Sequence, residues 1–520
     1  MTKLSVDRAL RKAKSHERNG QMDEAVKLYH SVLAVFPSNT RAKQGLAKLS
    51  QPKPGTLAGK NPSDETLNQL IALYNKGQIR TVTQECDRLT KEFPQSFLLW
   101  NLLGAANNAQ GKLEEAIAAH NKALLIKPDF AEAHNNIGAA FQSQGKFEEA
   151  SAAYNKALLI KPDYARAHYN LGITLQELGR LEEAVASYRK AIALIPDYAE
   201  AHYNLGNTLQ ELGRSKDAEA SYRKAIALKP DYAEAHSNLG ITLQALGRLE
   251  EAEASYRQAV AMKPDYADAH YNLGITLKEL GRLEEAEASY RQAISLKPDY
   301  LEAKHMLSAL TGETTKSAPR IYVENLFDYY ASKFDTSLVD NLEYKIPKII
   351  AEMLLRNHND GSLGSVLDLG CGTGLAGVEI KQFCAYLEGI DLSNQMLEKA
   401  RRKNIYDKLT HRDIVDYLAS ESLDFDYFIS TDVFIYLGDL STVFQLIKSR
   451  NKSGGKLVFS TENTDKDGFS LEQSGRYSHS KQYIESLCKR FSYKLCHFEN
   501  LNLRKEKNLY IRGGLYLLAF

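Results

Sequence analysis

The chain has 520 residues, and its 66 lysines and arginines nearly balance its 65 aspartates and glutamates. A chain of this length is expected to fold into two or more domains, each with its own hydrophobic core. The balanced charge argues against a general nucleic-acid binder and against a polybasic membrane binder.

The cysteines and the hydropathy of the chain indicate in which cellular compartment the protein is expected. The five cysteines show no Cys-x-x-Cys spacing, so we expect neither a disulfide framework nor a metal site. The N-terminus lacks the apolar core of a signal peptide, and no window holds the roughly 18 uninterrupted apolar residues of a membrane span. The simplest interpretation is a cytoplasmic protein with neither a membrane nor a nucleic-acid partner.

Internal repeats are the first organised feature of the chain. In one unit, Leu171 and Leu175 share a face of a first predicted helix, and Ala184 and Tyr188 share a face of a second. Pro196 then prevents the second helix from continuing. The same unit recurs every 34 residues, marked by prolines at 94, 128, 162, 196, 230, 264 and 298.

This period and pattern resemble the tetratricopeptide repeat (TPR). The resemblance implies an all-α solenoid over residues 63–310, in which 301–310 is the closing helix. Residues 1–49 contain a degenerate unit that ends at Pro37, and residues 50–62 have the composition of a flexible linker. We therefore predict eight units, six or seven of them in one continuous stack.

One asparagine recurs at the same position of successive first helices. Because an amide both donates and accepts hydrogen bonds, a ladder of amides along a concave groove would suit the backbone of an extended peptide. The residues around it resemble the TPR region of O-linked N-acetylglucosamine transferases, where such a ladder holds substrate protein. Alternatively, these residues cap or bridge helices, or duplication copied them. The column comprises Asn136, Asn170, Asn204, Asn238 and Asn272.

The polar segment 311–319 is predicted to be a linker, and residues 322–335 have the pattern of a helix rich in aromatic residues. An apolar strand then leads into the run Gly370-x-Gly372-x-Gly374. A dinucleotide-binding fingerprint would have a small residue where this chain has Leu375. A second apolar strand ends at Asp391, 21 positions after Gly370, where α/β proteins bind ribose hydroxyls.

These residues resemble the cofactor half of the class I S-adenosylmethionine (SAM) dependent methyltransferases over residues 320–520. The resemblance implies an α/β Rossmann-like domain with a mostly parallel seven-stranded sheet. It also implies a set of cofactor-binding residues, with Asp391 on the ribose and Asp413 on the adenine amine. The alternative is a glycine turn in a fold that binds NAD or nothing. The implied set is Asp368, Gly370, Cys371, Gly372, Gly374, Asp391, Leu392, Met396 and Asp413.

The segments 327–331 and 344–347 resemble a bacterial group of predicted methyltransferases joined to TPR repeats. In that setting Tyr329 and Tyr330 are expected to face the methyl acceptor, although a packing role is an equal alternative. After the predicted fourth strand, Ser430-Thr-Asp-Val-Phe lacks the Asn/Asp-Pro-Pro-aromatic run of enzymes that methylate base amines. The expected acceptor is an oxygen, nitrogen or carboxyl group of a small molecule or a protein.

Methyl transfer to a hydroxyl or an amine requires removal of a proton. His479, in the loop after the fifth strand, is the leading candidate base because imidazole titrates near neutrality. Asp432 and Tyr436 are further catalytic candidates, and Arg476 and Tyr477 are candidates for binding the acceptor.

The sequence thus supports two functional hypotheses. The first is a SAM-dependent methyltransferase whose TPR repeats bind a protein partner or substrate. The second is a TPR adaptor whose C-terminal domain binds SAM without turnover.

Overall fold

The computed structural model of the protein describes residues 3–19, 21–36, 39–50, 61–331, 334–336, 338, 342–356, 362–506 and 509–520. These residues form two compact units, Met1–Lys229 and Pro230–Phe520. Pro37 and most of the expected linker 50–62 lie outside the described residues. No helix in the described ranges is both long enough and apolar enough to cross a membrane.

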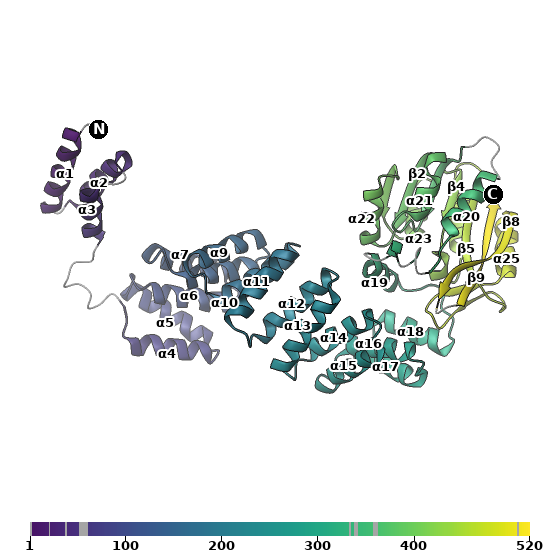
Figure 1. Ribbon diagram of the computed structural model, residues 1–520, viewed down its shortest axis with the longest axis horizontal. Helices are drawn as coiled ribbons and strands as arrows, with labels where there is room; N and C mark the ends of the chain where they lie inside the picture. Colours follow the sequence, from purple (N-terminus) through teal and green to yellow (C-terminus); the bar gives the residue numbers. More distant parts are fainter. Residues whose placement is uncertain are drawn as a thin grey trace. The chain divides into compact units, whose positions relative to one another are not determined.

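The first unit consists of helices that pair along the chain as antiparallel hairpins (Figure 1). They are α1 (Lys3–Arg18), α2 (Met22–Val35), α3 (Thr40–Ser50), α4 (Asp64–Asn75), α5 (Ile79–Glu92), α6 (Phe97–Ala109), α7 (Leu113–Ile126), α8 (Ala131–Ser143), α9 (Phe147–Ile160), α10 (Ala165–Glu177), α11 (Leu181–Leu194), α12 (Ala199–Glu211) and α13 (Ser215–Leu228).

A glycine and a tyrosine hold the two helices of several hairpins together. A Cβ atom on Gly172 of α10 would lie 2.6 Å from the Tyr188 ring of α11, so only glycine leaves room for this fully buried ring. Gly179 ends the first helix with a φ of 69°. The same contact recurs in Gly138/Tyr154, Gly206/Tyr222, Gly240/Tyr256 and Gly274/Tyr290.

The second unit begins with two further hairpins and a closing helix. These are α14 (Ala233–Ala245), α15 (Leu249–Met262), α16 (Ala267–Glu279), α17 (Leu283–Leu296) and α18 (Leu301–Thr311). In α18, His305 is buried, its ring lies 4.8 Å from that of Tyr322, and its Nε2 lies 2.9 Å from the Gly475 carbonyl oxygen. The final repeats are therefore packed against the C-terminal domain.

The expected linker 311–319 is also bound to that domain. The backbone N–H of Ala318 donates to the Tyr436 carbonyl at 3.0 Å, and the N–H groups of Gly438 and Asp439 donate to the Lys316 carbonyl. The Thr315 and Tyr477 hydroxyls are hydrogen-bonded to each other. Polar composition predicted a free connection here, whereas its polar groups bond to a loop distant in sequence.

The C-terminal domain is built on one mostly parallel sheet, so the predicted fold class is confirmed. The core strand order is β3-β2-β1-β4-β5, after which β9 pairs antiparallel to β5 and β8 pairs with β9. The short hairpin β6–β7 pairs with the end of β5, which brings the described strands to nine. They are β1 (Gly364–Leu369), β2 (Cys384–Asp391), β3 (Lys408–His411), β4 (Tyr427–Ser430), β5 (Lys456–Asn463), β6 (Phe469–Leu471), β7 (Tyr477–His479), β8 (Lys494–Glu506) and β9 (Leu509–Ala519).

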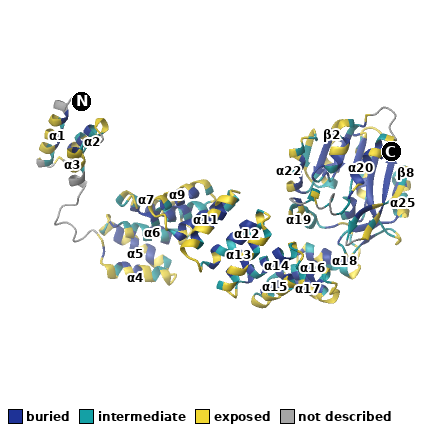
Figure 2. Cartoon of the chain, viewed as in Figure 1, coloured by how far each residue is buried: buried dark blue, intermediate teal, exposed yellow. Residues whose placement is uncertain are grey.

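Two apolar cores cover the two faces of this sheet, whose strands are largely buried (Figure 2). Alternate strand residues contribute to opposite cores: Phe428 packs with α23, α24 and α25, and Ile429 packs with α20 and α21. The helices of this domain are α19 (Arg320–Tyr330), α20 (Ile346–Arg356), α21 (Leu375–Ile380), α22 (Asn394–Lys403), α23 (Ile414–Ser420), α24 (Ser441–Arg450) and α25 (Lys481–Phe491).

Candidate functional site

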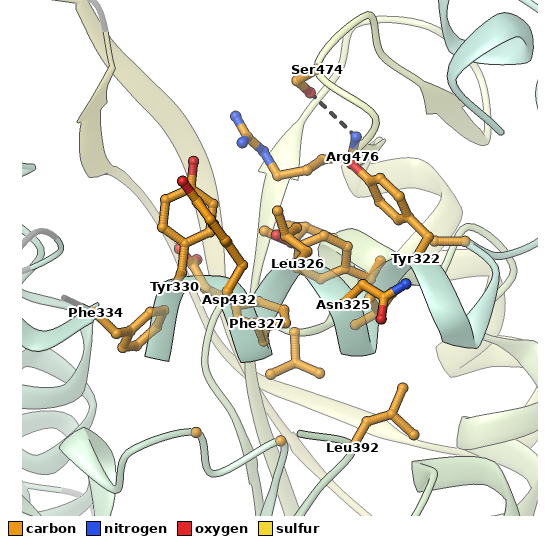
Figure 3. Close-up of a pocket in the computed structure, with 18 of the residues that line it drawn as sticks. Tyr322, Asn325, Leu326, Phe327, Tyr330, Phe334, Leu392, Asp432, Ser474 and Arg476 are labelled. Atoms are coloured by element: carbon orange, nitrogen blue, oxygen red, sulfur yellow. Dashed lines mark hydrogen bonds between the residues drawn. The ribbon is translucent and has the colours of Figure 1, made fainter. Parts of the chain in front are cut away.

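A cavity of about 1020 Å³ lies at the carboxyl ends of the parallel strands. It is lined by residues that follow β1, β2, β3 and β4, by α19, and by residues of α14, α16 and α18. Figure 3 shows α19 carrying Tyr322, Leu326 and Tyr330, with Leu392 across the cavity from them. The connection from β3 to β4 crosses the sheet, so the strand order reverses between β1 and β4. Open α/β sheets usually bind ligands at such a point.

The glycine turn between β1 and α21 gives this cavity an open stretch of backbone. Gly370, Gly372 and Gly374 all have left-handed φ values, of 77°, 53° and 88°. A Cβ on Gly370 would lie 2.5 Å from Val433, so that glycine permits close packing inside the protein. A Cβ on Gly372 would meet only Phe334, at 4.0 Å, so a ligand can approach the backbone there.

Asp391, at the end of β2, lies beside this turn and lines the cavity. Its Oδ2 accepts a hydrogen bond from the Gly372 N–H, and its Oδ1 accepts one from the Ser393 N–H, both at 2.8 Å. Burial raises the pKa of this carboxyl, and the two backbone donors oppose the rise. The remaining lone pairs of the carboxylate can accept hydrogen bonds from vicinal hydroxyls.

Asp368 is fully buried under the glycine turn and is not among the cavity-lining residues. The Tyr406 hydroxyl donates to its Oδ2 at 2.7 Å, whereas its Oδ1 has no hydrogen-bond partner among the described residues. Burial raises the pKa of this carboxyl to about 7, and nearby Asp391 adds to the rise. An unsatisfied buried carboxylate oxygen is costly, so this position is suited to a cationic partner.

The other expected cofactor residues divide into two groups. Cys371, Leu392 and Asp413 line the cavity. Asp413 also caps α23 by accepting from the Val415 and Asp416 N–H groups, and it pairs with Arg320 at 3.1 Å. The prediction for Met396 needs correction, because this side chain is fully buried in α22 outside the cavity, and Leu392 provides the apolar surface instead.

Helix α19 and the residues after it are tethered over the cofactor side of the cavity. Asp328 accepts a hydrogen bond from the Ser393 hydroxyl at 2.5 Å, and Asp335 accepts from Thr373 and, at 2.8 Å, from Lys403. No sequence motif predicted these tethers. The only available signal was the pair of acidic residues within an otherwise aromatic segment.

Charged side chains form a buried network on the other side of the cavity. The Arg476 guanidinium, expected to bind an acidic acceptor, donates instead to Glu462 at 2.8 Å and to Glu506. Arg504 pairs with Asp432 and with the same Glu462, and its side chain is 5% exposed. Because carboxylates occupy both guanidinium groups, the expected role of Arg476 needs correction. Arg504 lies on the edge strand β8 and belongs to no sequence motif, so the sequence did not predict its place in this network.

Asp432 and Tyr436 both line the cavity. Asp432 has a φ of 56°, a conformation that is uncommon for residues other than glycine and is often found at functional sites. Its carboxylate is held by Arg504, and the Ser460 hydroxyl lies 3.4 Å from its Oδ1. Burial raises the pKa of the Tyr436 hydroxyl, so this phenol stays protonated at neutral pH.

The structure corrects the prediction that His479 acts as the base. This side chain is fully buried in β7, does not line the cavity, and has its Nε2 2.9 Å from the Leu437 carbonyl oxygen. Burial lowers its pKa to about 4. Tyr477 is likewise buried away from the cavity, against α18 and residue 315. The hairpin β6–β7 turns both side chains into the interior, a direction that loop composition did not indicate.

Tyr329 and Tyr330, at the end of α19, line the cavity and are about half exposed. Their rings contact each other edge to face, with centroids 5.4 Å apart. The position is compatible with the acceptor contact expected of them.

In the first unit, the asparagine column bridges successive repeats. The amide of Asn170 donates to the Asn135 side chain at 3.1 Å, and that of Asn204 donates to the Tyr169 hydroxyl at 3.0 Å. Asn136 donates in the same way to Asn101. These donors support the helix-bridging alternative at three of the five positions. Asn272, in the second unit, lines the cavity.

Comparison with known proteins finds a different kind of family model for each half of the chain. A model described as a methyltransferase domain matches residues 360–512. Models of the tetratricopeptide repeat match residues 9–39, 104–145, 141–179, 174–213, 197–265 and 237–300.

Curated relatives share the C-terminal domain at low identity. A ubiquinone biosynthesis O-methyltransferase from Idiomarina loihiensis is 30% identical over 21% of this chain and 47% of its own length. A ribosomal RNA large subunit methyltransferase G from Shewanella woodyi is 31% identical over 23% of this chain and 26% of its own. A malonyl-[acyl-carrier protein] O-methyltransferase from Bacillus anthracis is 25% identical over 33% of this chain and 67% of its own length.

The chain therefore spans about half or less of the length of the first two relatives.

Among solved structures, the TPR protein YrrB is 28% identical, with a TM-score of 0.34, over 36% of this chain and 97% of its own length. The protein thus carries tetratricopeptide repeats in its N-terminal part and a methyltransferase domain in its C-terminal part.

Proposed function

We propose that the C-terminal domain binds SAM and transfers its methyl group to an oxygen, nitrogen or carboxyl acceptor, while the TPR repeats bind a protein or peptide. One observation carries this proposal. The open backbone at Gly372 and the carboxylate of Asp391 face the same cavity as α19 and the loop after β4. Cofactor-binding groups and space for an acceptor are therefore contiguous.

The residues around the cavity fit the parts of SAM. The Asp391 carboxylate suits the ribose hydroxyls, and the backbone at Gly372 gives close access to the methionine part. Asp368 lies under the glycine turn and does not line the cavity, so its carboxylate would attract the cationic groups of SAM across the turn without contacting them. Leu392 and Val415 supply apolar surface for the adenine, with Asp413 beside them as an acceptor. When bound, SAM supplies an electrophilic methyl group on a cationic sulfur.

The protein's own contribution is alignment and exclusion of water. Helix α19 covers the cofactor side through its tethers to Ser393 and Asp413. Phe327 of α19 packs edge to face on Tyr436, with ring centroids 5.3 Å apart, and this pair borders the acceptor space. Such apolar walls keep water from competing with the acceptor for the methyl group.

The adaptor without turnover remains a second candidate because of one specific observation. None of the described residues that line the cavity is a histidine, and the carboxylate of Asp432 is held by Arg504. Near the loop after β4, an acceptor hydroxyl would therefore find no imidazole, and the carboxylate there is already paired.

Turnover distinguishes the two candidates. The full chain is incubated with methyl-labelled SAM and fractionated cell lysate, and S-adenosylhomocysteine is measured beside the label in protein and small-molecule fractions. We expect release from the wild type and from Asp465→Ala, which changes an exposed loop carboxylate, and loss of release from Asp391→Ala. If SAM binds and no fraction supports S-adenosylhomocysteine formation, the adaptor is the correct function.

A further inference from the structure

The cavity extends from the glycine turn onto the last complete repeats. Within the second unit, α14 contributes Gln244, and α16 contributes Tyr271, Asn272 and Glu279 to its lining. Solenoid repeats use the extended surfaces formed by equivalent helices to bind other chains. A polypeptide bound along α14 and α16 would thus reach the loops that follow β1 and β4.

Asn272 differs from its counterparts in the first unit. Asn170 and Asn204 use their amides to bridge repeats, whereas the side chain of Asn272 makes no hydrogen bond within the described residues. An amide that lines a cavity and has free donor and acceptor atoms can bind one peptide unit of an extended chain through both. This feature favours a polypeptide over a free small molecule at the α16 end.

The charges around the cavity favour a cationic group. Glu279, exposed at the end of α16, has no ion pair or hydrogen bond in the described part of the chain. Lys278, the lining lysine, donates to the Gln473 carbonyl at 3.2 Å. All the lining arginines are paired with carboxylates: Arg320 with Asp413 and Asp416, Arg412 with Glu421, Arg476 with Glu462 and Glu506, and Arg504 with Asp432 and Glu462. An acidic acceptor would meet no unpaired guanidinium group, whereas a cation would meet Glu279.

Aromatic rings, and the absence of a histidine from the described lining, further favour an amine as the acceptor. Tyr271, Tyr322, Phe327, Tyr330 and Tyr436 line the cavity, and the faces of such rings attract ammonium groups. A hydroxyl acceptor needs a base at the site, and none of the described lining residues is a histidine. An amine that has lost its proton to water needs none, because its lone pair is already free to attack.

We infer that the acceptor is a lysine-type primary amine on an extended polypeptide that binds along α14 and α16. This inference rests on the proposed methyl transfer. In the step, the lone pair of the neutral amine forms the new N–C bond as the C–S bond of the sulfonium breaks. The sulfur retains the electron pair of that bond as a neutral thioether, and the methylated ammonium product releases a proton to water.

Synthetic peptides test this inference on the full chain. Four pools of short unstructured peptides differ only at the central residue, which is lysine, Nε-acetyl-lysine, glutamate or serine. Each pool is incubated with methyl-labelled SAM and the wild type, Asn272→Ala, Glu279→Gln or Glu284→Gln. Glu284→Gln is the matched control, because Glu284 is exposed on α17 and does not line the cavity.

We expect label on the lysine pool alone. Asn272→Ala and Glu279→Gln should each raise the peptide KM about tenfold, because each removes one polar contact. Glu284→Gln should leave KM unchanged, and all variants should bind SAM as the wild type does. Label on the glutamate or serine pool, no label on any pool while SAM binds, or an unchanged KM in both cavity variants would overturn the inference. If the wild type does not bind SAM, the proposed function itself is refuted.

Discussion

Asp368 is the residue whose chemistry depends most on what binds beside it. Its carboxyl is fully buried, it receives one hydrogen bond from Tyr406, and its Oδ1 has no partner among the described residues. Burial raises its pKa to about 7, so the free protein holds this group protonated below neutrality. A cation bound in the cavity, on the other side of the glycine turn, would favour the ionised form of this carboxyl and lower that pKa.

The affinity for SAM should therefore depend on pH through Asp368. Below the raised pKa, binding must release the proton of Asp368, so affinity is lost as pH falls; above it, the carboxylate is already ionised. Between about pH 8 and pH 6 the dissociation constant should rise about tenfold in the wild type. Titration calorimetry at several pH values measures this change.

Asp368→Asn serves as the control for this pH dependence, because asparagine keeps the acceptor for Tyr406 and does not titrate. Its dissociation constant should vary less with pH than that of the wild type. An equal pH dependence in both proteins would show that another group is responsible.

At this scale, the sequence predicted backbone better than side chains. Gly372 and Asp391 lie at one cavity because the spacing of a strand, a turn and a second strand determines their positions. His479, Met396 and Arg476 could not be assigned correctly, because burial or ion pairing with residues distant in sequence determines where their side chains point.

Helix α19 is the element that joins the two sides of the cavity. Its outer end is held by Arg320 on Asp413 and Asp416, and its inner end by Asp328 on Ser393. Arg320 is half exposed, so its ion pairs contribute only about 1 kcal/mol or less. The hydrogen bond to the fully buried Ser393 is the stronger tether.

Asp328→Ala should therefore loosen α19 and speed the dissociation of SAM. The expected increase in the dissociation rate is about fivefold to tenfold, which corresponds to the loss of one hydrogen bond of about 1 kcal/mol or slightly more. Stopped-flow measurements on the full chain determine this rate. Glu324→Ala on the same helix is the matched control, since no ion pair of Glu324 is found in the described structure, and an equal effect of both variants would contradict the tether.

The elements themselves were largely predictable. A period of 34 residues predicted the helical hairpins, and the resemblance over residues 320–520 implied the α/β domain, which is confirmed. The segment 311–319 differed, because its backbone pairs with residues 436–439. Local composition indicates whether a segment can bend and carries no information about distant hydrogen-bond partners.

At the scale of the whole chain, the compact unit Pro230–Phe520 unites the final repeats with the methyltransferase domain. The packing of α18 through His305, and the lining of the cavity by α16, are consequences of this union. No sequence motif predicted this packing. The repeats and the methyltransferase domain each have their own sequence pattern, and neither pattern includes the residues that contact the other part.

SAM binding is the central claim, and titration calorimetry of the full chain with SAM tests it most directly. The account predicts a micromolar dissociation constant for the wild type and for Asp465→Ala. It also predicts binding weakened about tenfold or more by Asp391→Ala, because the ribose hydroxyls lose a charged acceptor. No heat of binding with the wild type, or equal affinity in Asp391→Ala, would contradict the account.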